Sequence, residues 1–300
     1  MPSEKMKFMP SKELMTADEI FSIAKTFTDL GVNKIRLTGG EPLVRLDFDD
    51  IIQKLSTLPV SLHMTTNAML LDQHIDSLVA AGLNHLNISI DSLDENQFLK
   101  MTKVDAGKKV KENIELALSK GIHVKLNIVL MRGVNDHEII ELISLARHNP
   151  LSVRFIEFMP FNGNDWERNK TIDHDEIIEK VSTYFNEQPI ELPTKANDTA
   201  KNYTLKEFKG DFGIIGTVTK PFCESCNRIR LTADGKLKNC LFASHEPDIL
   251  TPLREGKEIL PIITETIQSK AKARGGMETN SAFETESQSH KNRSMIAIGG

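Results

Sequence analysis

Three cysteines lie close together in the sequence, and their spacing suits a metal. Cys223 and Cys226 form a Cys-x-x-Cys pair, and Cys240 follows them. Three soft thiolates suit either a zinc ion or an iron–sulfur cluster. If His245 joins them, a closed tetrahedral zinc site is expected; if it does not, three thiolates leave one iron of a [4Fe-4S] cluster open to a substrate atom. Clustered cysteines also favour a reducing compartment, and hence a cytoplasmic protein, over a disulfide framework.

Basic side chains follow the cysteine pair directly. In Asn227-Arg228-Ile229-Arg230-Leu231 the two arginines alternate onto one face of a predicted strand. Two guanidinium groups beside a metal form a bidentate clamp for a phosphate or a carboxylate. A solvated strand face is the alternative, and the neighbouring cysteines favour the clamp.

Further candidate ligand-binding residues lie at the ends of predicted strands. Gly39 and Gly40 have no Cβ atoms, so a ligand can approach the backbone there. Thr65 and Ser89 supply hydroxyl groups at two other strand ends, although either residue could instead cap a helix. Met159 ends a fifth strand, where a residue of the hydrophobic core is the simpler interpretation.

Two basic residues, Arg36 and Lys125, lie inside predicted strands. Strands of a parallel sheet are normally covered on both faces, and apolar residues dominate them. If these side chains point into a barrel, they need an anionic partner, because an unpaired buried charge is strongly disfavoured. A bound anion is one such partner.

The elements that must position these residues alternate between strands and helices. Strands are predicted at 34–38, 61–66, 85–90, 123–130 and 152–158, with helices at 18–30, 48–57, 71–82, 107–120 and 136–147. Repeated β-α units require a parallel sheet. Five units are fewer than the eight of a complete barrel, so an incomplete TIM-type parallel β/α barrel is predicted, with an open doubly wound sheet as the alternative. In both folds the ligand site lies at the carboxyl ends of the strands.

Composition and pattern changes suggest the domain organisation. Residues 1–160 are predicted to form the partial barrel, 161–267 a smaller iron–sulfur and substrate-binding region, and 268–300 a polar, mobile or weakly packed tail ending in Gly-Gly. The chain has 37 Lys and Arg against 42 Asp and Glu, a net charge of −5, which provides no global field for nucleic acid or an anionic membrane. No signal peptide or membrane span is read from the sequence.

Several segments share the pattern of one enzyme family. They are residues 35–43 with Gly-Gly-Glu-Pro, Thr65-Thr66-Asn67, residues 87–91, residues 154–159, the cysteine region 222–235 and the terminal Gly299-Gly300. Together they resemble the GTP 3′,8-cyclase (MoaA) family of radical S-adenosylmethionine enzymes, which begins molybdenum cofactor biosynthesis. The cysteine region and the Gly-Gly end make the resemblance specific, because Gly-Gly-Glu-Pro alone indicates only the superfamily.

The resemblance implies a role for each candidate residue. Cys223, Cys226 and Cys240 would hold the family's second [4Fe-4S] cluster, whose open iron binds the guanine of GTP, and His245 would be a bystander. Contacts to GTP are implied for Arg36, Thr65, Lys125, Arg228, Ile229 and Arg230, and contacts to S-adenosylmethionine for Gly40, Ser89 and Met159. No catalytic residue is assigned.

The activity implied by the resemblance is the conversion of GTP and S-adenosylmethionine to 3′,8-cyclo-7,8-dihydro-GTP, 5′-deoxyadenosine and methionine. In the family, a 5′-deoxyadenosyl radical takes the ribose 3′ hydrogen of GTP, and C3′ then attacks C8 of guanine. The protein positions both ligands and excludes water. A reductant such as flavodoxin or ferredoxin is implied, and a homodimer is compatible with the resemblance.

One departure from the family pattern concerns the N-terminal region. The family carries a Cys-x-x-x-Cys-x-x-Cys motif there, ligating the cluster that cleaves S-adenosylmethionine, and this sequence has no such motif. Met1-Pro2 resembles the pair that follows the motif, so a fragment or incomplete gene model lacking the first barrel strand is expected, with a naturally short, inactive homologue as the alternative. The chain as written is therefore expected to be inactive. A GTP-binding three-cysteine module without radical chemistry and a zinc-stapled structural protein are the alternative functions.

Overall fold

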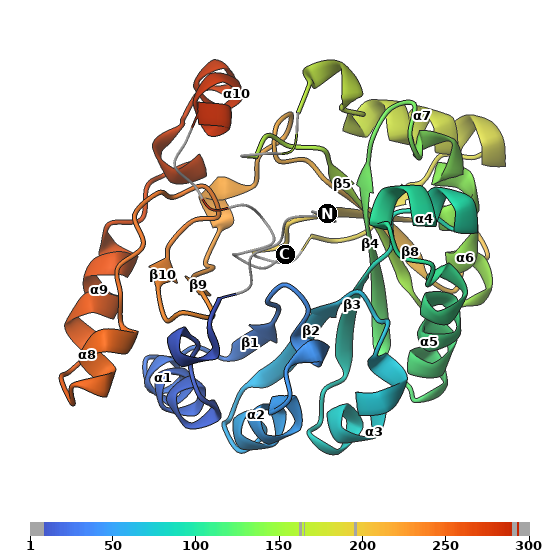
Figure 1. Ribbon diagram of the computed structural model, residues 1–300. Helices are drawn as coiled ribbons and strands as arrows, with labels where there is room; N and C mark the ends of the chain where they lie inside the picture. Colours follow the sequence, from blue (N-terminus) through green and yellow to red (C-terminus); the bar gives the residue numbers. More distant parts are fainter. Residues whose placement is uncertain (1–8, 162–163, 165, 195–196, 290–292, 294–300) are drawn as a thin grey trace. The chain divides into compact units, whose positions relative to one another are not determined.

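The computed structural model describes residues 9–161, 164, 166–194, 197–289 and 293. They form two compact units, and Figure 1 shows the elements of both. Unit 1 contains Thr66–Asp72 and His85–Cys226; unit 2 contains the described residues of Ser3–Thr65, Gln73–Asn84 and Asn227–Gly300. The terminal Gly299-Gly300 and Met1-Pro2, singled out in the sequence, lie outside the described residues.

Unit 1 is built on a sheet with the strand order β3-β4-β5-β8-β7-β6. The parallel strands are β3 (His85–Ser89), β4 (His123–Leu130), β5 (Ser152–Glu157) and β8 (Asp211–Ile215). Strand β7 (Lys201–Thr204) is antiparallel to β8, and β6 (Ile190–Glu191) is antiparallel to β7. The fold is the mostly parallel α/β fold of a partial TIM-type barrel, as the alternating pattern predicts.

The helices of unit 1 are short and amphipathic. They are α4 (Glu95–Thr102), α5 (Gly107–Ser119), α6 (Ile139–His148) and α7 (His174–Phe185), with the 3-10 turns η3 (Asp136–Glu138), η4 (Arg168–Lys170) and η5 (Cys223–Ser225). Helix α5 packs against β4, and α6 packs against β5 and β8, as Figure 1 shows. Fully buried side chains such as Leu126, Phe155 and Phe212 fill the space between helices and sheet.

Strand β4 has one apolar face and one polar face. Leu126 and Ile128 are buried, whereas Lys125 and Asn127 are half-buried. Strand β5 repeats this alternation and leaves Arg154 half-buried. Because alternate residues of a strand point to opposite faces, polar and basic side chains of neighbouring strands share one face of the sheet.

Unit 2 contains two short pairs of strands and the remaining helices. Strand β1 (Lys34–Leu37) runs parallel to β2 (Ser61–Thr66), and β9 (Arg230–Leu231) runs antiparallel to β10 (Leu237–Lys238). The helices are α1 (Ala17–Asp29), α2 (Phe48–Leu55), α8 (Leu250–Arg254), α9 (Leu260–Gln268) and α10 (Asn280–Ser289), with η1 (Ser11–Glu13), η2 (Pro42–Val44) and η6 (Arg274–Gly276). Helix α3 (Leu71–Ala80) begins in unit 1 and continues in unit 2.

An apolar cluster in unit 2 joins the first helix to the C-terminal part of the chain. Its buried members are Met15, Ile23, Phe27, Leu237, Ile249, Leu250, Ile259 and Ile263. Thr16 caps α1 in a reciprocal capping box with Glu19, and Arg254 of α8 binds the same Glu19 at 2.6 Å. The hairpin β9–β10 is therefore supported by a segment more than 200 residues away in the sequence.

The five predicted strands are all present, but two segments differ from expectation. Strand β8 lies in the region predicted to follow the barrel, yet it pairs in parallel with β5. The C-terminal stretch, predicted to be polar and weakly packed, contains α10, in which Phe283 is fully buried beneath the guanidinium of Arg274, 4.8 Å from the ring centroid. Among the described helices, none has the length and apolar character that a membrane crossing needs.

Candidate functional site

The Cys-x-x-Cys pair forms a tight turn at the end of unit 1. Cys223 begins η5, and the backbone N–H of Cys226 donates to the carbonyl of Cys223 at 3.1 Å. Both thiols are half-buried. The turn thus presents two thiol groups that an incoming metal can reach.

Cys240 belongs to unit 2, where it follows strand β10. The neighbouring Asn239 donates to the carbonyl of Thr266 in α9 at 3.0 Å, which ties this segment to the helix. Cys240 is a half-buried thiol, and His245 is exposed. Within the described part of the chain, no group of three or more His, Cys, Asp or Glu side chains is arranged to hold a metal ion. The chemistry of the donors, rather than their arrangement, therefore supports three cysteine ligands.

The arginine segment leads into the hairpin β9–β10. The strand predicted over 227–231 is wrong at its beginning, because β10 pairs only with Arg230 and Leu231. Ile229 and Leu231 pack against the apolar cluster of unit 2. Arg230 lies between them and is half-buried, whereas Arg228 precedes the strand and is exposed.

Ion pairs surround the turn of this hairpin. Lys238 of β10 is fully buried, and its Nζ donates to Glu246 at 2.8 Å. Arg293 binds Asp234 at 2.8 Å and Glu246 at 2.7 Å. Burial raises the pKa of Asp234, but hydrogen bonds from Arg293 and Thr232 outweigh it and lower the pKa to about 2. Asp234 is therefore ionised at neutral pH and neutralises Arg293.

Replacing Gly235 with alanine is expected to destabilise the hairpin by about 3 kcal/mol. Gly235 has a φ of +71°, and a Cβ atom there would lie 2.3 Å from the Cβ of Leu250. Gly256 is a matched control, because it has the same φ of +71°, yet no heavy atom of the described residues would lie within 4 Å of a Cβ atom added there. Gly256→Ala is expected to cost only about 1 kcal/mol. Urea denaturation monitored by circular dichroism measures both, and equal losses would contradict the packing explanation.

Two of the predicted GTP-contacting residues lie on the strand pair β1–β2 in unit 2. Arg36 is opposite His63 in the register, and its Nη2 lies 3.4 Å from His63 Nδ1. Thr65 is half-buried, two residues after His63 and on the same face of the strand. The buried Leu62 and Met64 point to the other face. The pattern therefore brings Arg36 and Thr65 to one side of the pair.

The Gly-Gly-Glu-Pro segment forms the turn that follows β1. Gly39 has a φ of +93°, a conformation that glycine adopts without strain. The carboxylate of Glu41 accepts the backbone N–H of Leu43 at 3.1 Å and so caps η2. Gly40 is exposed. The segment thus serves as a β-to-helix turn and leaves the backbone at Gly40 accessible.

The polar face of the sheet in unit 1 carries residues in register across four strands. One row contains Asn87, Lys125, Ser152 and Asp211; the next row toward the carboxyl ends contains Ser89, Asn127, Arg154 and Gly213. The exposed Ser89 and the half-buried Lys125 are thus on the same face and one row apart. Arg154 belongs to this face too, although sequence reasoning did not name it as a site residue. The signal was available, because Arg154 is a charged residue inside a predicted parallel strand, as Lys125 is.

Asp211 supplies negative charge beside these two cations. Burial raises the pKa of Asp211, while a hydrogen bond from Ser152 at 3.0 Å and the charges of Lys125 and Arg154 act in the opposite direction. A cavity of about 240 Å³ lies at the amino ends of the strands, lined in part by Lys125, Asp211 and Lys209. The anionic partner expected for Lys125 therefore includes a carboxylate of the protein itself.

Met159 follows strand β5 and is half-buried. Its carbonyl accepts the side-chain N–H of Asn164 at 2.8 Å. The predicted site residues divide between the units. Unit 1 holds Ser89, Lys125, Met159, Cys223 and Cys226, and unit 2 holds Arg36, Gly40, Thr65, Arg228, Ile229, Arg230 and Cys240.

Two family models match the chain. The Radical SAM superfamily model matches residues 2–146, and the model described as Molybdenum Cofactor Synthesis C matches residues 151–275. Among solved structures, the crystal structure of Streptococcus suis SuiB covers 74% of this chain and 53% of that chain, with a TM-score of 0.57 and 17% sequence identity. That likeness shows the fold.

Curated relatives extend over nearly the whole chain. "GTP 3′,8-cyclase, mitochondrial" of Arabidopsis thaliana is 39% identical, covering 100% of this chain and 76% of the relative. "GTP 3′,8-cyclase" of Desulforamulus reducens is 38% identical, covering 90% of this chain and 85% of the relative. The match to "Molybdenum cofactor biosynthesis protein 1" of Drosophila melanogaster, 38% identical, covers 91% of this chain and 49% of the relative, so this chain spans about half the length of that protein. The chain therefore belongs to the GTP 3′,8-cyclase family of molybdenum cofactor biosynthesis, within the radical S-adenosylmethionine superfamily.

Proposed function

We propose that this chain takes part in the conversion of GTP and S-adenosylmethionine to 3′,8-cyclo-7,8-dihydro-GTP, 5′-deoxyadenosine and methionine. One observation carries the proposal. A Cys-x-x-Cys turn is followed at once by an arginine-bearing hairpin, in a chain 38–39% identical to two proteins named GTP 3′,8-cyclase. Thiolates can hold a metal, and guanidinium groups close by in sequence can bind the phosphates of a nucleotide.

The chemistry of the donors fits an iron–sulfur cluster. Cys223, Cys226 and Cys240 are half-buried thiols, and soft thiolates are the ligands that such clusters prefer. Three cysteine ligands would leave one iron of a [4Fe-4S] cluster without a protein ligand, and that iron would supply a docking point for the guanine base. A closed zinc site would also need His245, which is exposed.

The residues proposed to contact GTP are Arg36, Thr65, Lys125, Arg228, Ile229 and Arg230. Four of them carry positive charge, which suits a triphosphate. Arg154, on the same polar face as Lys125, adds a fifth cation to this set. Asp211 beside both cations partly neutralises them, so the bound phosphates meet a limited excess of positive charge.

Gly40, Ser89 and Met159 are proposed to contact S-adenosylmethionine. Gly40 and Ser89 are exposed and lie at the carboxyl ends of β1 and β3, and Met159 lies just after β5. In parallel β/α folds this edge is where ligands bind. A backbone without a Cβ atom, a hydroxyl group and a flexible thioether side chain are each able to contact an adenosyl or a methionine moiety.

One alternative function is supported by a specific observation. The sequence contains three cysteines, and all three are in the proposed cluster site. A GTP-binding module without radical chemistry needs no cysteine ligands beyond these three. The proposal as a cyclase further includes a reductant such as flavodoxin or ferredoxin and a homodimer. It also includes a cytoplasmic location, because cysteines clustered in the sequence favour a reducing compartment.

Arg228→Ala and Arg230→Ala are each expected to weaken GTP binding about tenfold or more, because each removes charge-assisted hydrogen bonds to a phosphate or to the base. Isothermal titration of the anaerobically reconstituted chain with GTP measures the effect. Iron content is expected to stay unchanged, since neither arginine is a ligand. Arg168→Ala, at an exposed arginine of η4 in unit 1, is the control for loss of one positive charge. Unchanged GTP affinity, or loss of iron in either variant, would contradict the assignment.

A further inference from the structure

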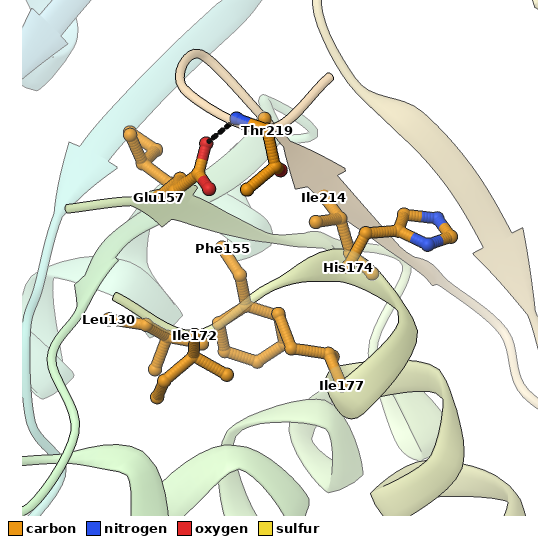
Figure 2. Close-up of a pocket in the computed structure, with 10 residues that line it drawn as sticks. Leu130, Phe155, Glu157, Ile172, His174, Ile177, Ile214 and Thr219 are labelled. Atoms are coloured by element: carbon orange, nitrogen blue, oxygen red, sulfur yellow. Dashed lines mark hydrogen bonds between the residues drawn. The ribbon is translucent and has the colours of Figure 1, made fainter. Parts of the chain in front are cut away.

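The loop that leads into the Cys-x-x-Cys turn is attached to the sheet of unit 1. This loop, residues 216–222, connects β8 to η5. Glu157, the last residue of β5, accepts the backbone N–H groups of Val218 at 2.7 Å and Thr219 at 3.1 Å, both through Oε2. Figure 2 shows the Glu157 carboxylate and its hydrogen bond to Thr219. The two hydrogen bonds thereby join Glu157 to residues that follow it by 61 and 62 positions in the sequence.

The surroundings of Glu157 are mostly apolar. Glu157 is only 5% exposed, and the pocket beside it is lined by apolar residues that include Leu130, Phe155 and Ile172, which Figure 2 labels. A buried carboxylate is costly unless hydrogen bonds compensate it. Its Oε1 has no hydrogen-bond partner among the described residues. Within that part of the chain, the hydrogen bonds of this carboxylate thus go to the backbone of the loop, and an apolar residue would otherwise suit the position.

A second contact holds the same loop near its end. Lys220 Nζ binds Asp175 at 2.8 Å and lies 3.3 Å from Nδ1 of His174, both in α7. Hydrogen bonds from Lys220 and from His174 lower the pKa of Asp175 to about 2. Asp175 is largely exposed, so solvent screens this ion pair. Glu157 therefore makes the stronger of the two attachments.

Cys223 follows Lys220 after only two residues, so the position of the loop determines where the Cys223–Cys226 turn begins. Cluster ligands bind best when they are held in place before the metal arrives. In metal sites generally, hydrogen bonds to the ligand-bearing segments hold the ligands in this way. A loop without its attachment samples more conformations and loses more entropy when its thiols bind iron.

We propose that Glu157 is a positioning residue for the Cys223–Cys226 turn. It fixes loop 216–222 through the N–H groups of Val218 and Thr219, and the loop in turn determines where the cysteine turn begins. The inference rests on the proposed function, because the cluster that it serves is the one assigned to Cys223, Cys226 and Cys240. Glu157 itself touches neither iron nor substrate in this proposal.

Two substitutions at Glu157 and one matched control test this role. Glu157→Gln keeps an oxygen acceptor but removes the charge, and Glu157→Leu removes both. Glu138 is the control, since it is 3% exposed and accepts hydrogen bonds at 2.6 Å from both the hydroxyl of Ser92 and the backbone N–H of Leu93. Glu138→Gln therefore perturbs a similarly buried carboxylate in unit 1 whose hydrogen bonds go to Ser92 and Leu93 and not to loop 216–222.

The primary measurement is the rate at which the reconstituted chain releases iron to a chelator under anaerobic conditions. Release is expected to be about tenfold faster in Glu157→Leu and intermediate in Glu157→Gln, with Glu138→Gln unchanged. Hydrogen exchange at the Val218 and Thr219 amides is expected to accelerate in the same order, and the electron paramagnetic resonance spectrum of the reduced cluster is expected to broaden.

The outcomes separate the inference from the function on which it rests. Iron release within twofold of the unsubstituted chain in Glu157→Leu would overturn the positioning role while leaving the cluster intact. An equal acceleration in Glu138→Gln would also overturn it, because the effect would then follow from general destabilisation. Failure of the unsubstituted chain to bind iron would overturn the proposed cluster and the inference together.

Discussion

Replacing Cys223, Cys226 or Cys240 with serine is expected to lower the iron bound by the anaerobically reconstituted chain from about four atoms to fewer than about one. A serine hydroxyl is far less acidic than a thiol and is a harder ligand, so it replaces a thiolate poorly at iron. Iron and sulfide analysis, with the visible absorption of the cluster, measures the change. The effect is close to all-or-none because each of the three ligands closes one corner of the same cluster.

His245→Ala is the matched control for the cysteine variants. The histidine is exposed, and the proposed cluster has no role for it, so iron content is expected to remain unchanged. A structural zinc site predicts the opposite set of results: one zinc atom, no iron, and loss of zinc on replacement of His245. Metal analysis of the unsubstituted chain and of this variant therefore distinguishes the two metals.

Regular alternation made the sheet of unit 1 predictable from sequence. Strand β4 buries every second residue over eight positions, and glycines follow helices α3 and α5. Strand β8 could not be predicted in this way. It is short, and the antiparallel strands β6 and β7 precede it, so the strand–helix rhythm that reveals the other parallel strands is absent.

The parts of the candidate site that could be predicted are those in which the residue type itself indicates the chemistry. Three clustered cysteines and two arginines can be found by their chemistry and spacing alone. The role of Glu157 could not be found, because it depends on backbone N–H groups about 60 residues away that have no sequence signature. The strand predicted at Arg228 failed for a similar reason, because the sequence pattern does not reveal which backbone groups are available for pairing. The alternation of residues 227–231 predicts a strand, but a strand also needs a partner, and β10 pairs with two residues only.

Helix α10 shows how a few residues outweigh composition. The stretch from 268 is rich in polar residues, and its average composition predicts weak packing. Phe283 nevertheless packs edge-to-face on Phe242, with centroids 4.7 Å apart, and Arg274 covers it. Burial of one large aromatic side chain removes a large apolar area from water, and this stabilises the packing of the short helix.

The 300-residue chain by itself is expected to form no detectable 5′-deoxyadenosine from S-adenosylmethionine. Reductive cleavage of S-adenosylmethionine in this superfamily requires a cluster held by three thiolates. This sequence has three cysteines, and all of them are assigned to the cluster proposed to bind GTP. The chain alone therefore lacks thiolates for a second cluster. The expected loss is at least about a thousandfold relative to an enzyme with both clusters, since no other group in the chain replaces that electron donor.

Incubation with S-adenosylmethionine, GTP and dithionite, followed by quantification of 5′-deoxyadenosine by mass spectrometry, measures this activity. The GTP 3′,8-cyclase of Desulforamulus reducens, 38% identical to this chain, is the positive control. A version of the chain extended at its N-terminus by a Cys-x-x-x-Cys-x-x-Cys segment is expected to gain activity and about four further iron atoms. Product formed by the 300-residue chain, and lost in Cys223→Ser, would show instead that the cluster at Cys223, Cys226 and Cys240 cleaves S-adenosylmethionine, and would reverse the assignment of that cluster to GTP.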